Sequence, residues 1–277
     1  ITEAIIKNGV VNIGSCAFCN RRELASITIP DSVTSIGYDA FSGCTSLTSI
    51  TIPDSVTSIG SYAFHDTAYY NNNANWKNDV LYISNHLIKA KDRISGDYVI
   101  KGGTKCIANN AFSNCTGLTS ITIPDSVTSI GNSAFYGCTG LKEVHISSVE
   151  KWCNIDFASN VYYGRDTANP LYYAHILYLN GEKVTDLVIP DGVTNIGDYA
   201  FVGCTGLKSV TVPESVEYIG RYAFSACPDD LLMITDNLIA CNYARSNGIN
   251  LKTNLDPRYP GQYNNPVVSF EVLDVSI

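Results

Sequence analysis

The sequence of 277 residues has little charge, few basic residues, a single methionine and no long apolar run. Charged residues make up only 16% of it, and the net charge of −8 at pH 7 disfavours binding to nucleic acids or to anionic membranes. No apolar stretch approaches the ~20 residues that span a bilayer, so we expect no membrane insertion. The chain begins at Ile1, which we interpret as the start of a mature or excised fragment. The lack of a signal peptide therefore does not argue against secretion.

A repeat of 23 residues dominates the sequence. Fifteen residues recur almost unchanged in Ile27–Phe41, Ile50–Phe64 and Ile121–Phe135. An Ala-Phe pair marks the same phase seven times, at Phe18, Phe41, Phe64, Phe112, Phe135, Phe201 and Phe224. The steps between these phenylalanines are 23, 23, 48, 23, 66 and 23 residues, which indicates a regular coil with two interruptions.

Each repeat combines a short strand with a turn. In Leu47–Pro53 β-branched residues alternate with small polar ones, so Ile50 and Ile52 should face inward and Pro53 should end the strand. One unit cannot bury its own apolar side chains, but stacked units can, and their strands then form a parallel sheet. We predict nine strands in phase, near Ala4, Ile27, Ile50, Tyr98, Ile121, Val144, Leu187, Val210 and Met233. The seven phenylalanines should form a structural core ladder.

The pattern L-x-x-I-x-I-P-x-x-V-x-x-I-G-x-x-A-F-x-x-C, over roughly residues 1–250, resembles the BspA-like leucine-rich repeats of bacterial surface proteins. The resemblance implies a leucine-rich-repeat solenoid, a right-handed coil with a parallel concave β-sheet and short 3-10 or helical turns on the convex side. Members of this family are typically secreted or attached to the cell surface, and some are implicated in adhesion. The resemblance implies no catalytic motif and no cofactor.

Two insertions interrupt the repeat, at about residues 65–95 and 147–183. The first contains Asp79–Lys91, whose two apolar runs predict a β-hairpin. The second opens with Ser148–Phe157, which has helical spacing after a possible serine cap, and continues into a hairpin with Asn180-Gly181 at its turn. Insertions in solenoids often lie on the binding face.

The insertions are rich in aromatic residues. The candidate ligand contacts among them are Tyr69, Tyr70, Trp76, Tyr162, Tyr163, Tyr172 and Tyr173. Two interpretations are open. The rings can pack each insertion onto the solenoid, which we favour, or they can form an aromatic contact patch.

The outward positions of the predicted sheet carry mostly Ser and Thr. They form either a hydroxyl ladder that favours strands or a shallow groove for a protein or glycan. Glu143, His145 and Asp186 depart from the consensus there and flank the second insertion, so we expect any site on the sheet to include them.

Five of the ten cysteines follow the repeat phenylalanine by three residues, namely Cys44, Cys115, Cys138, Cys204 and Cys227. In-register side chains run parallel, which suits disulfide geometry poorly, so we expect free thiols. The spacing Cys16-x-x-Cys19 has no second pair nearby, and we expect no metal site. We expect His65 and His86 to lie in surface loops.

The C-terminal region departs from the repeat after Cys227. Asp236–Asn247 predicts a helix, part of a cap over about residues 228–250 that covers the end of the stack. Residues 251–277 suggest a linker and the strand-like tail Val267–Ile277, which either folds back on the solenoid or begins a further domain.

These observations predict a non-catalytic, secreted or surface-displayed module that binds a protein or glycan on a host or neighbouring cell, and that is monomeric. The alternative is a structural spacer that presents another domain. A less favoured hypothesis is an enzyme that uses Cys153 and His175, although nothing local resembles a protease signature.

Overall fold

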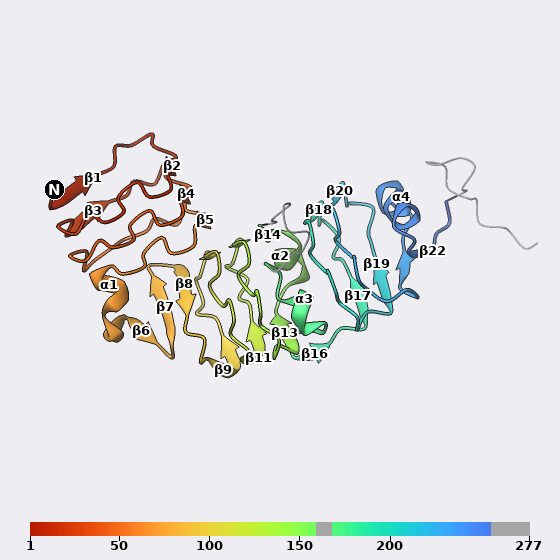
Figure 1. Cartoon of the computed structure of the whole chain (residues 1–277). Coiled ribbons are helices and arrows are strands. Elements are labelled where there is room, and N and C mark those ends of the chain that lie inside the picture. Colours follow the sequence, from red (N-terminus) through yellow and green to blue (C-terminus); the bar gives the residue numbers. More distant parts are fainter. Residues whose placement is uncertain (159–167, 256–277) are drawn as a thin grey trace, which may run out of the picture.

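The computed structural model describes residues 1–158 and 168–255, which form a repeat solenoid of about ten turns (Figure 1). Successive turns pair through parallel strands at a spacing of one repeat, so that Ile121 lies beside Val144 and Leu187 beside Val210. The predicted solenoid is therefore confirmed. No helix within the described residues is long and apolar enough to span a bilayer.

One side of the coil carries the row of strands that the repeat predicts. Its members are β1 (Glu3–Ile5), β3 (Ser26–Thr28), β9 (Ser95–Val99), β11 (Gly117–Thr122), β13 (Glu143–Ile146), β15 (Leu177–Leu179), β17 (Asp186–Val188), β19 (Ser209–Thr211), β21 (Leu232–Ile234) and β22 (Asn250–Lys252). The row is divided into three sheets, β1-β3, β9-β11-β13-β15 and β17-β19-β21-β22. The divisions coincide with the two insertions.

The strand predicted near Ile50 is absent. Ile50 and Ile52 still point into the core, but the backbone around them bonds to the first insertion instead of to an in-register strand. The amide of Ile52 donates to Ser84 Oγ at 3.0 Å, and the carbonyl of Leu47 accepts from the amide of Tyr69 at 2.8 Å. The side-chain pattern around Ile50 is that of a strand, but the first insertion occupies the position where a neighbouring strand would pair with it.

A second row of strands, which the sequence did not predict, runs along another side of the coil (Figure 1). Its two-residue members are β2 (Asn12–Ile13), β4 (Ser35–Ile36), β5 (Ser58–Ile59), β10 (Cys106–Ile107), β12 (Ser129–Ile130), β14 (Asp156–Phe157), β18 (Asn195–Ile196) and β20 (Tyr218–Ile219). The expected 3-10 or helical turns occur in the regular repeats only as single turns, with hydrogen bonds such as Cys44 N to Phe41 O at 3.2 Å. The described helices lie in the insertions and at the C-terminal end.

The repeat phenylalanines stack in three separate runs. Ring centroids lie 5.2 Å apart for Phe18 and Phe41, 5.1 Å for Phe112 and Phe135, and 5.3 Å for Phe201 and Phe224, with nearly parallel planes. Five of the seven phenylalanines are followed three residues later by a cysteine, and the thiols of Cys44, Cys138 and Cys227 bond to the previous repeat phenylalanine. Cys44 Sγ donates to Phe18 O and Cys138 Sγ to Phe112 O, both at 3.1 Å. The ladder thiols thus supply hydrogen bonds between neighbouring turns.

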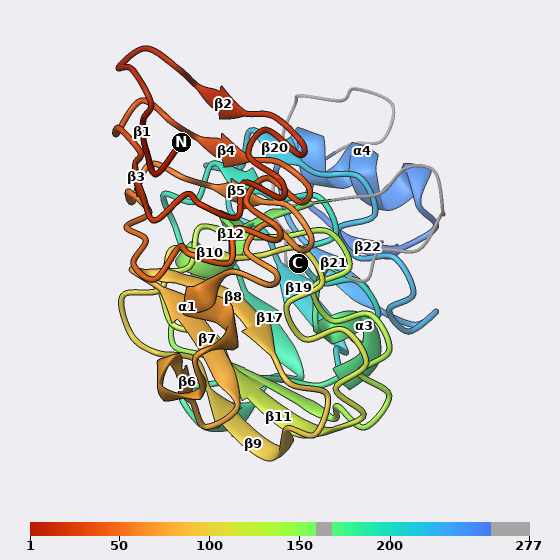
Figure 2. The same ribbon diagram turned by 60° about the vertical axis from the view of Figure 1, so that its left-hand side comes forward.

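The first insertion holds α1 (Ala68–Asn71), the 3-10 helix η1 (Asn73–Asn75), β6 (Trp76–Lys77), β7 (Val80–Ile83) and β8 (His86–Ala90). The predicted hairpin is confirmed, since β7 and β8 pair antiparallel. β8 also pairs parallel with β10, so the hairpin joins the second row of strands (Figure 2). It contributes Val80 and Leu87 to the main core and Leu81, Ile83 and Ile88 to a separate N-terminal core. The hairpin therefore connects two blocks of the solenoid.

The prediction that His86 lies in a surface loop is wrong. His86 is fully buried in β8, where its Nε2 lies 3.1 Å from the carbonyl oxygen of Pro53. Its Nδ1 is buried and has no hydrogen-bond partner in the described structure. Burial lowers the pKa of His86, so the imidazole is held neutral. The sequence pattern missed this because a polar residue beside a hairpin turn ordinarily faces solvent.

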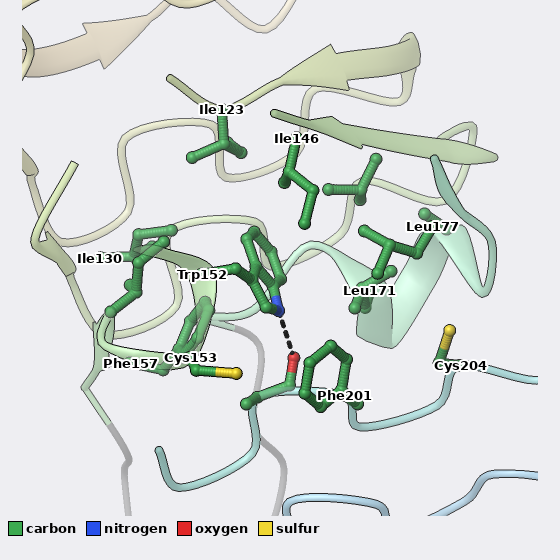
Figure 3. Packing of buried hydrophobic residues seen from close by; sticks show 14 of the residues in the cluster. Ile123, Ile130, Ile146, Trp152, Cys153, Phe157, Leu171, Leu177, Phe201 and Cys204 are labelled. Atoms are coloured by element: carbon green, nitrogen blue, oxygen red, sulfur yellow. Dashed lines mark hydrogen bonds between the residues drawn. The ribbon is translucent and has the colours of Figure 1, made fainter. Parts of the chain in front are cut away.

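The second insertion contains α2 (Val149–Cys153), α3 (Leu171–Ala174) and a hairpin of β15 with β16 (Glu182–Lys183). Ser148 caps α2 as predicted, and Asn180 and Gly181 adopt positive φ at the hairpin turn. Trp152 of α2 lies in the core close to Phe201 (Figure 3). The first hairpin arm, β15, pairs parallel with β13 and so supplies a turn of the solenoid that the phenylalanine pattern does not reveal.

The C-terminal end carries α4 (Leu238–Ser246), which buries Ala240, Cys241 and Ala244 against the last turn. Strand β22 then pairs parallel with β21. Residues 250–252 therefore belong to the solenoid, and a linker beginning at residue 251 is wrong. The strand-like tail Val267–Ile277 lies outside the described residues.

Candidate functional site

Three side chains gather on the outward face of the central sheet. Glu143 and His145 project from β13, and Tyr178 projects from β15. His145 Nε2 lies 3.1 Å from Glu143 Oε2, and the Tyr178 hydroxyl donates to Glu143 Oε1 at 3.4 Å. The His145 and Tyr178 rings stack with centroids 4.6 Å apart and planes 18° from parallel. We call these three residues the sheet-face cluster.

Strand register brings the sheet-face cluster together. His145 is the direct parallel partner of Thr122 on β11 and of Tyr178 on β15, so all three project on one side. The three cluster side chains are half-buried, and Val99 beside Thr122 is 69% exposed. The surface therefore combines two aromatic rings, a carboxylate and an exposed aliphatic side chain.

The cluster favours a hydrogen-bonding surface over a reactive one. Partial loss of hydration raises the pKa of the Tyr178 hydroxyl, and the nearby Glu143 carboxylate raises it further. Tyr178 is thus a protonated donor at neutral pH. Glu143 already accepts a hydrogen bond from Tyr178 and pairs with His145. The sheet-face cluster can therefore contact a partner through its rings and through its remaining hydrogen-bonding capacity.

Asp186, the third predicted sheet residue, lies in a different sheet. It is exposed on β17 and accepts from Ser209 Oγ at 2.6 Å and from Thr185 Oγ1 at 3.0 Å. These hydrogen bonds lower its pKa, so it remains a carboxylate. The structure brings Glu143 and His145 together, whereas Asp186 lies in the next sheet, beyond the hairpin β15-β16.

The aromatic residues of the first insertion mostly pack against one another. The Tyr69 hydroxyl donates to Tyr82 O at 3.1 Å, and Trp76 Nε1 donates to Tyr70 O at 2.7 Å. The Lys91 ammonium lies 4.8 Å from the centre of the Trp76 ring. Tyr69, Tyr70 and Trp76 remain half-buried, so they both support the insertion and keep part of each ring at the surface.

In the second insertion Tyr172 and Tyr173 are also half-buried, with ring centroids 5.1 Å apart. The Tyr173 hydroxyl accepts from the amide of Gly137 at 2.9 Å, which anchors α3 to the preceding repeat. Tyr162 and Tyr163 lie outside the described residues. The described aromatic residues of this insertion thus have clear packing roles.

Cys153 and His175 have different surroundings, since Cys153 is buried and His175 is exposed. Burial raises the pKa of the Cys153 thiol to about 12, so it is not a thiolate at neutral pH. His175 is exposed, and its Nδ1 lies 2.9 Å from Gly203 O. Cys16 and Cys19 lie in one surface turn, and no group of three or more His, Cys, Asp or Glu in the described part of the chain is placed to hold a metal ion.

A cavity that the sequence did not predict opens where the first insertion meets the solenoid. It has a volume of about 420 Å³ and is lined by Tyr70 of α1 and by residues of three segments, 60–65 after β5, 88–92 at the end of β8, and 109–114 after β10. Tyr62, His65, Lys89 and Asp92 are among its lining residues. The insertion was the only feature of the sequence that pointed to this cavity, because the segments that form its walls are up to 54 residues apart.

Comparison with known families accounts for the repeat. Six copies of the BspA-type leucine-rich repeat region match residues 1–98, 97–162 and 176–253. The chain belongs to this family. Most repeats of this chain carry Ser and Thr at the outward positions, so Glu143 and His145 are departures with their own geometry.

Solved structures similar to this BspA-type chain come from several bacteria. It is similar to a leucine-rich cell surface protein from Faecalibacterium prausnitzii, with 27% identity over 93% of this chain and 61% of that one, and a TM-score of 0.39. It is also similar to a leucine-rich repeat protein from Bacteroides ovatus, with 29% identity over 91% of this chain and 61% of that one, and a TM-score of 0.34. The pneumococcal vaccine antigen PcpA matches at 16% identity over 92% and 68% of the two chains, with a TM-score of 0.39.

The chain therefore spans 61% of the length of each of the first two proteins. Among the curated proteins no match is found.

Proposed function

We propose that this chain is a non-catalytic binding module, secreted or displayed on the cell surface, that recognises a protein or glycan on a host or neighbouring cell. The sheet-face cluster of Glu143, His145 and Tyr178 carries the proposal. Its rings stack at 4.6 Å on an outward face where most of the outward positions in the other repeats carry short hydroxyl side chains. Membership of a repeat family that generally serves as a protein-binding scaffold is consistent with it.

The repeat architecture does not require this cluster. Ser120 and Thr122 occupy the equivalent positions on the neighbouring strand β11, and the parallel ladder continues through them unchanged. Ordered aromatic side chains at a surface, with polar groups at their edges, are typical of recognition sites. A spacer would need only the repeats, so the cluster favours binding over a purely structural role.

The test restores the consensus on β13. The double variant Glu143→Ser/His145→Thr reproduces the outward residues of β11 and leaves the core untouched. The probes are immobilised extracellular-matrix proteins and a glycan array. We expect any partner that binds the unmodified chain to bind the variant with an affinity that is lower by about tenfold or more.

The matched control is Ser26→Ala/Thr28→Ala, which alters the same two outward positions on β3. It should bind like the unmodified chain. If the consensus variant also keeps full affinity for every partner found, or if no probe binds the unmodified chain, the sheet face is not the binding surface and the spacer function is favoured. Point variants are preferable to deleting the first insertion, because its hairpin belongs to both hydrophobic cores.

A further inference from the structure

We propose that the cavity at the junction of the first insertion binds a neutral carbohydrate, one or two sugar rings at the end of a glycan. This inference deepens the proposed binding function and rests on it, but it assigns a second site with its own ligand chemistry. The volume of about 420 Å³ lies within the range of ≈ 300–1,000 Å³ that is usual for small-molecule sites.

One wall of the cavity is aromatic. Tyr38, Tyr62, His65, Tyr70 and Trp76 form an unbroken series of ring contacts, with centroids 5.1 to 6.0 Å apart. Three of these rings, those of Tyr62, His65 and Tyr70, line the cavity itself. Tyr62 is 59% exposed, so its ring is accessible to a ligand. Such rings offer apolar faces to the C–H surface of a sugar and polar edges to its hydroxyls.

The other lining side chains include polar groups and carry both signs of charge. Lys89, Asp92, Asn109, Asn110 and Asn114 present an ammonium, a carboxylate and three amides. Within the described residues, no protein group donates a hydrogen bond to the Asp92 carboxylate, which leaves its acceptors available to a ligand. One cation beside one anion gives no net attraction for an anionic ligand, whereas carboxylates and amides suit the vicinal hydroxyls of a neutral sugar.

The walls are fixed in place across the junction. Lys89 Nζ donates to Asn110 O at 2.9 Å, and Asn110 Nδ2 donates to Ser61 Oγ at 2.6 Å. The amide of Asn109 donates to Ile59 O at 2.9 Å. These bonds join the three lining segments, so the cavity is largely formed before a ligand arrives, which lowers the entropic cost of binding.

A peptide is a poorer fit to this cavity. The amides of Asn109 and Asn110 already donate to Ile59 O and Asn132 O, so the wall offers no free strand edge there for an extended chain to pair with. The apolar surface consists of ring faces over a small floor of Ala63, Phe64 and Ile88. This arrangement lacks the deep apolar pockets that side-chain anchors of a peptide would need.

The experiment titrates the whole chain with maltose, lactose, mannobiose and N,N′-diacetylchitobiose, by calorimetry and by saturation-transfer NMR. We expect at least one of these neutral disaccharides to bind with a Kd of about 1 mM or tighter. Sialyllactose is the anionic probe and should bind no better than lactose. The proposal would be overturned if none of the neutral sugars showed saturable binding, or if only the anionic sugar did.

Two variants locate the binding. Tyr62→Asn removes a ring at a residue with φ of 58°, a conformation that Asn tolerates, and Asp92→Asn removes a carboxylate at an exposed position. Each should weaken sugar binding about tenfold. The matched control is Tyr222→Asn, because Tyr222 has the same φ of 58° and is 55% exposed on the last repeat, away from the cavity. Equal affinity in Tyr62→Asn and Tyr222→Asn would assign the sugar to another site.

The two proposals can fail separately. The consensus variant Glu143→Ser/His145→Thr should keep its affinity for the disaccharide, since neither residue lines the cavity. Loss of partner binding in that variant, together with no sugar binding by the unmodified chain, would support the sheet face and reject the cavity. Sugar binding that Tyr62→Asn abolishes and the consensus variant preserves would support the cavity alone.

Discussion

The indole Nε1 of Trp152 donates a hydrogen bond of 2.8 Å to the carbonyl oxygen of Ala200. In the regular repeats the equivalent alanine carbonyl accepts from the backbone amide of the previous phenylalanine, as Ala63 does from Phe41 and Ala223 from Phe201, both at 2.7 Å. No repeat phenylalanine directly precedes Ala200 in the stack, because the second insertion lies there. A side chain thus replaces a backbone ladder contact, and Asn169 Nδ2 adds a second bond of 3.0 Å to the same oxygen.

Substitution of Trp152 should separate its packing from its hydrogen bond. Trp152→Ala removes a fully buried ring and should lower the free energy of unfolding by about 3–5 kcal/mol. Trp152→Phe keeps a ring and loses the bond to Ala200, so the cost should be smaller, about 1–3 kcal/mol. Urea unfolding followed by circular dichroism measures both. A Trp76→Phe control removes the other tryptophan. Equal stability of the two Trp152 variants would show that the ring packing contributes nothing, whereas a Trp152→Phe variant as stable as the unmodified chain would show that the hydrogen bond contributes nothing.

The phenylalanine ladder should be sensitive to truncation at any buried step. Phe135→Ala leaves a cavity beside Phe112 and Cys138 and should cost about 3–5 kcal/mol in unfolding free energy. The adjacent Tyr136 is 50% exposed, and Tyr136→Ala should cost less than about 1 kcal/mol. Thermal unfolding of the two variants gives the comparison. Similar losses for both would mean that the ladder does not bear the stability that its burial suggests.

The ladder thiols should resist alkylation in the folded protein. Burial raises the pKa of Cys138 to about 12, so very little thiolate exists at pH 8, and the sulfur is inaccessible as well. Cys16 is exposed. Maleimide labelling followed by peptide mass spectrometry should modify Cys16 within minutes and Cys138 only after denaturant is added. Labelling of Cys138 at the rate of Cys16 would contradict the described burial.

Stability should fall as the pH drops below about 6.5. Burial lowers the pKa of His86 in the folded state. On acidification the unfolded chain therefore binds the proton at a higher pH and is stabilised relative to the folded chain. The contribution of neutral His86 is complete above its unfolded pKa of about 6.5 and is lost as pH falls toward the lower folded value. His86→Gln should flatten the profile of unfolding free energy between pH 8 and 5.5. The exposed His65→Gln variant is the control, and an unchanged slope in His86→Gln would assign the acid sensitivity elsewhere.

The periodic part of the fold follows from the sequence, and its interruptions do not. Ile27, Ile121 and Val210 could be placed in the core because the 23-residue period puts each beside an equivalent residue of a neighbouring turn. The strands of the second row are only two residues long, too short for an alternating pattern to register. The surroundings of His86 and Tyr178 depend on which neighbouring strand each hairpin strand pairs with. Packing between distant segments determines that pairing, and no local sequence pattern predicts it.

The same limit applies to the candidate sites. Glu143 and His145 could be singled out because they depart from a consensus, whereas their partner Tyr178 could be found only once β15 was seen to join the sheet. The lining of the junction cavity lies in three separate segments, two of them regular repeat positions such as Tyr62. The chemistry of the cavity arises where the two blocks meet. The 23-residue period shows that the repeat is interrupted there, but it does not predict which side chains come together.

The hairpin β7-β8 gives the molecule a mechanical joint. β8 continues the second row of strands through two residue pairs with β10, His86 with Cys106 and Leu87 with Ile107, and the hairpin also places side chains in both hydrophobic cores. Loosening of this insertion would therefore uncouple the two blocks, so the solenoid should unfold as one cooperative unit only while the hairpin stays folded.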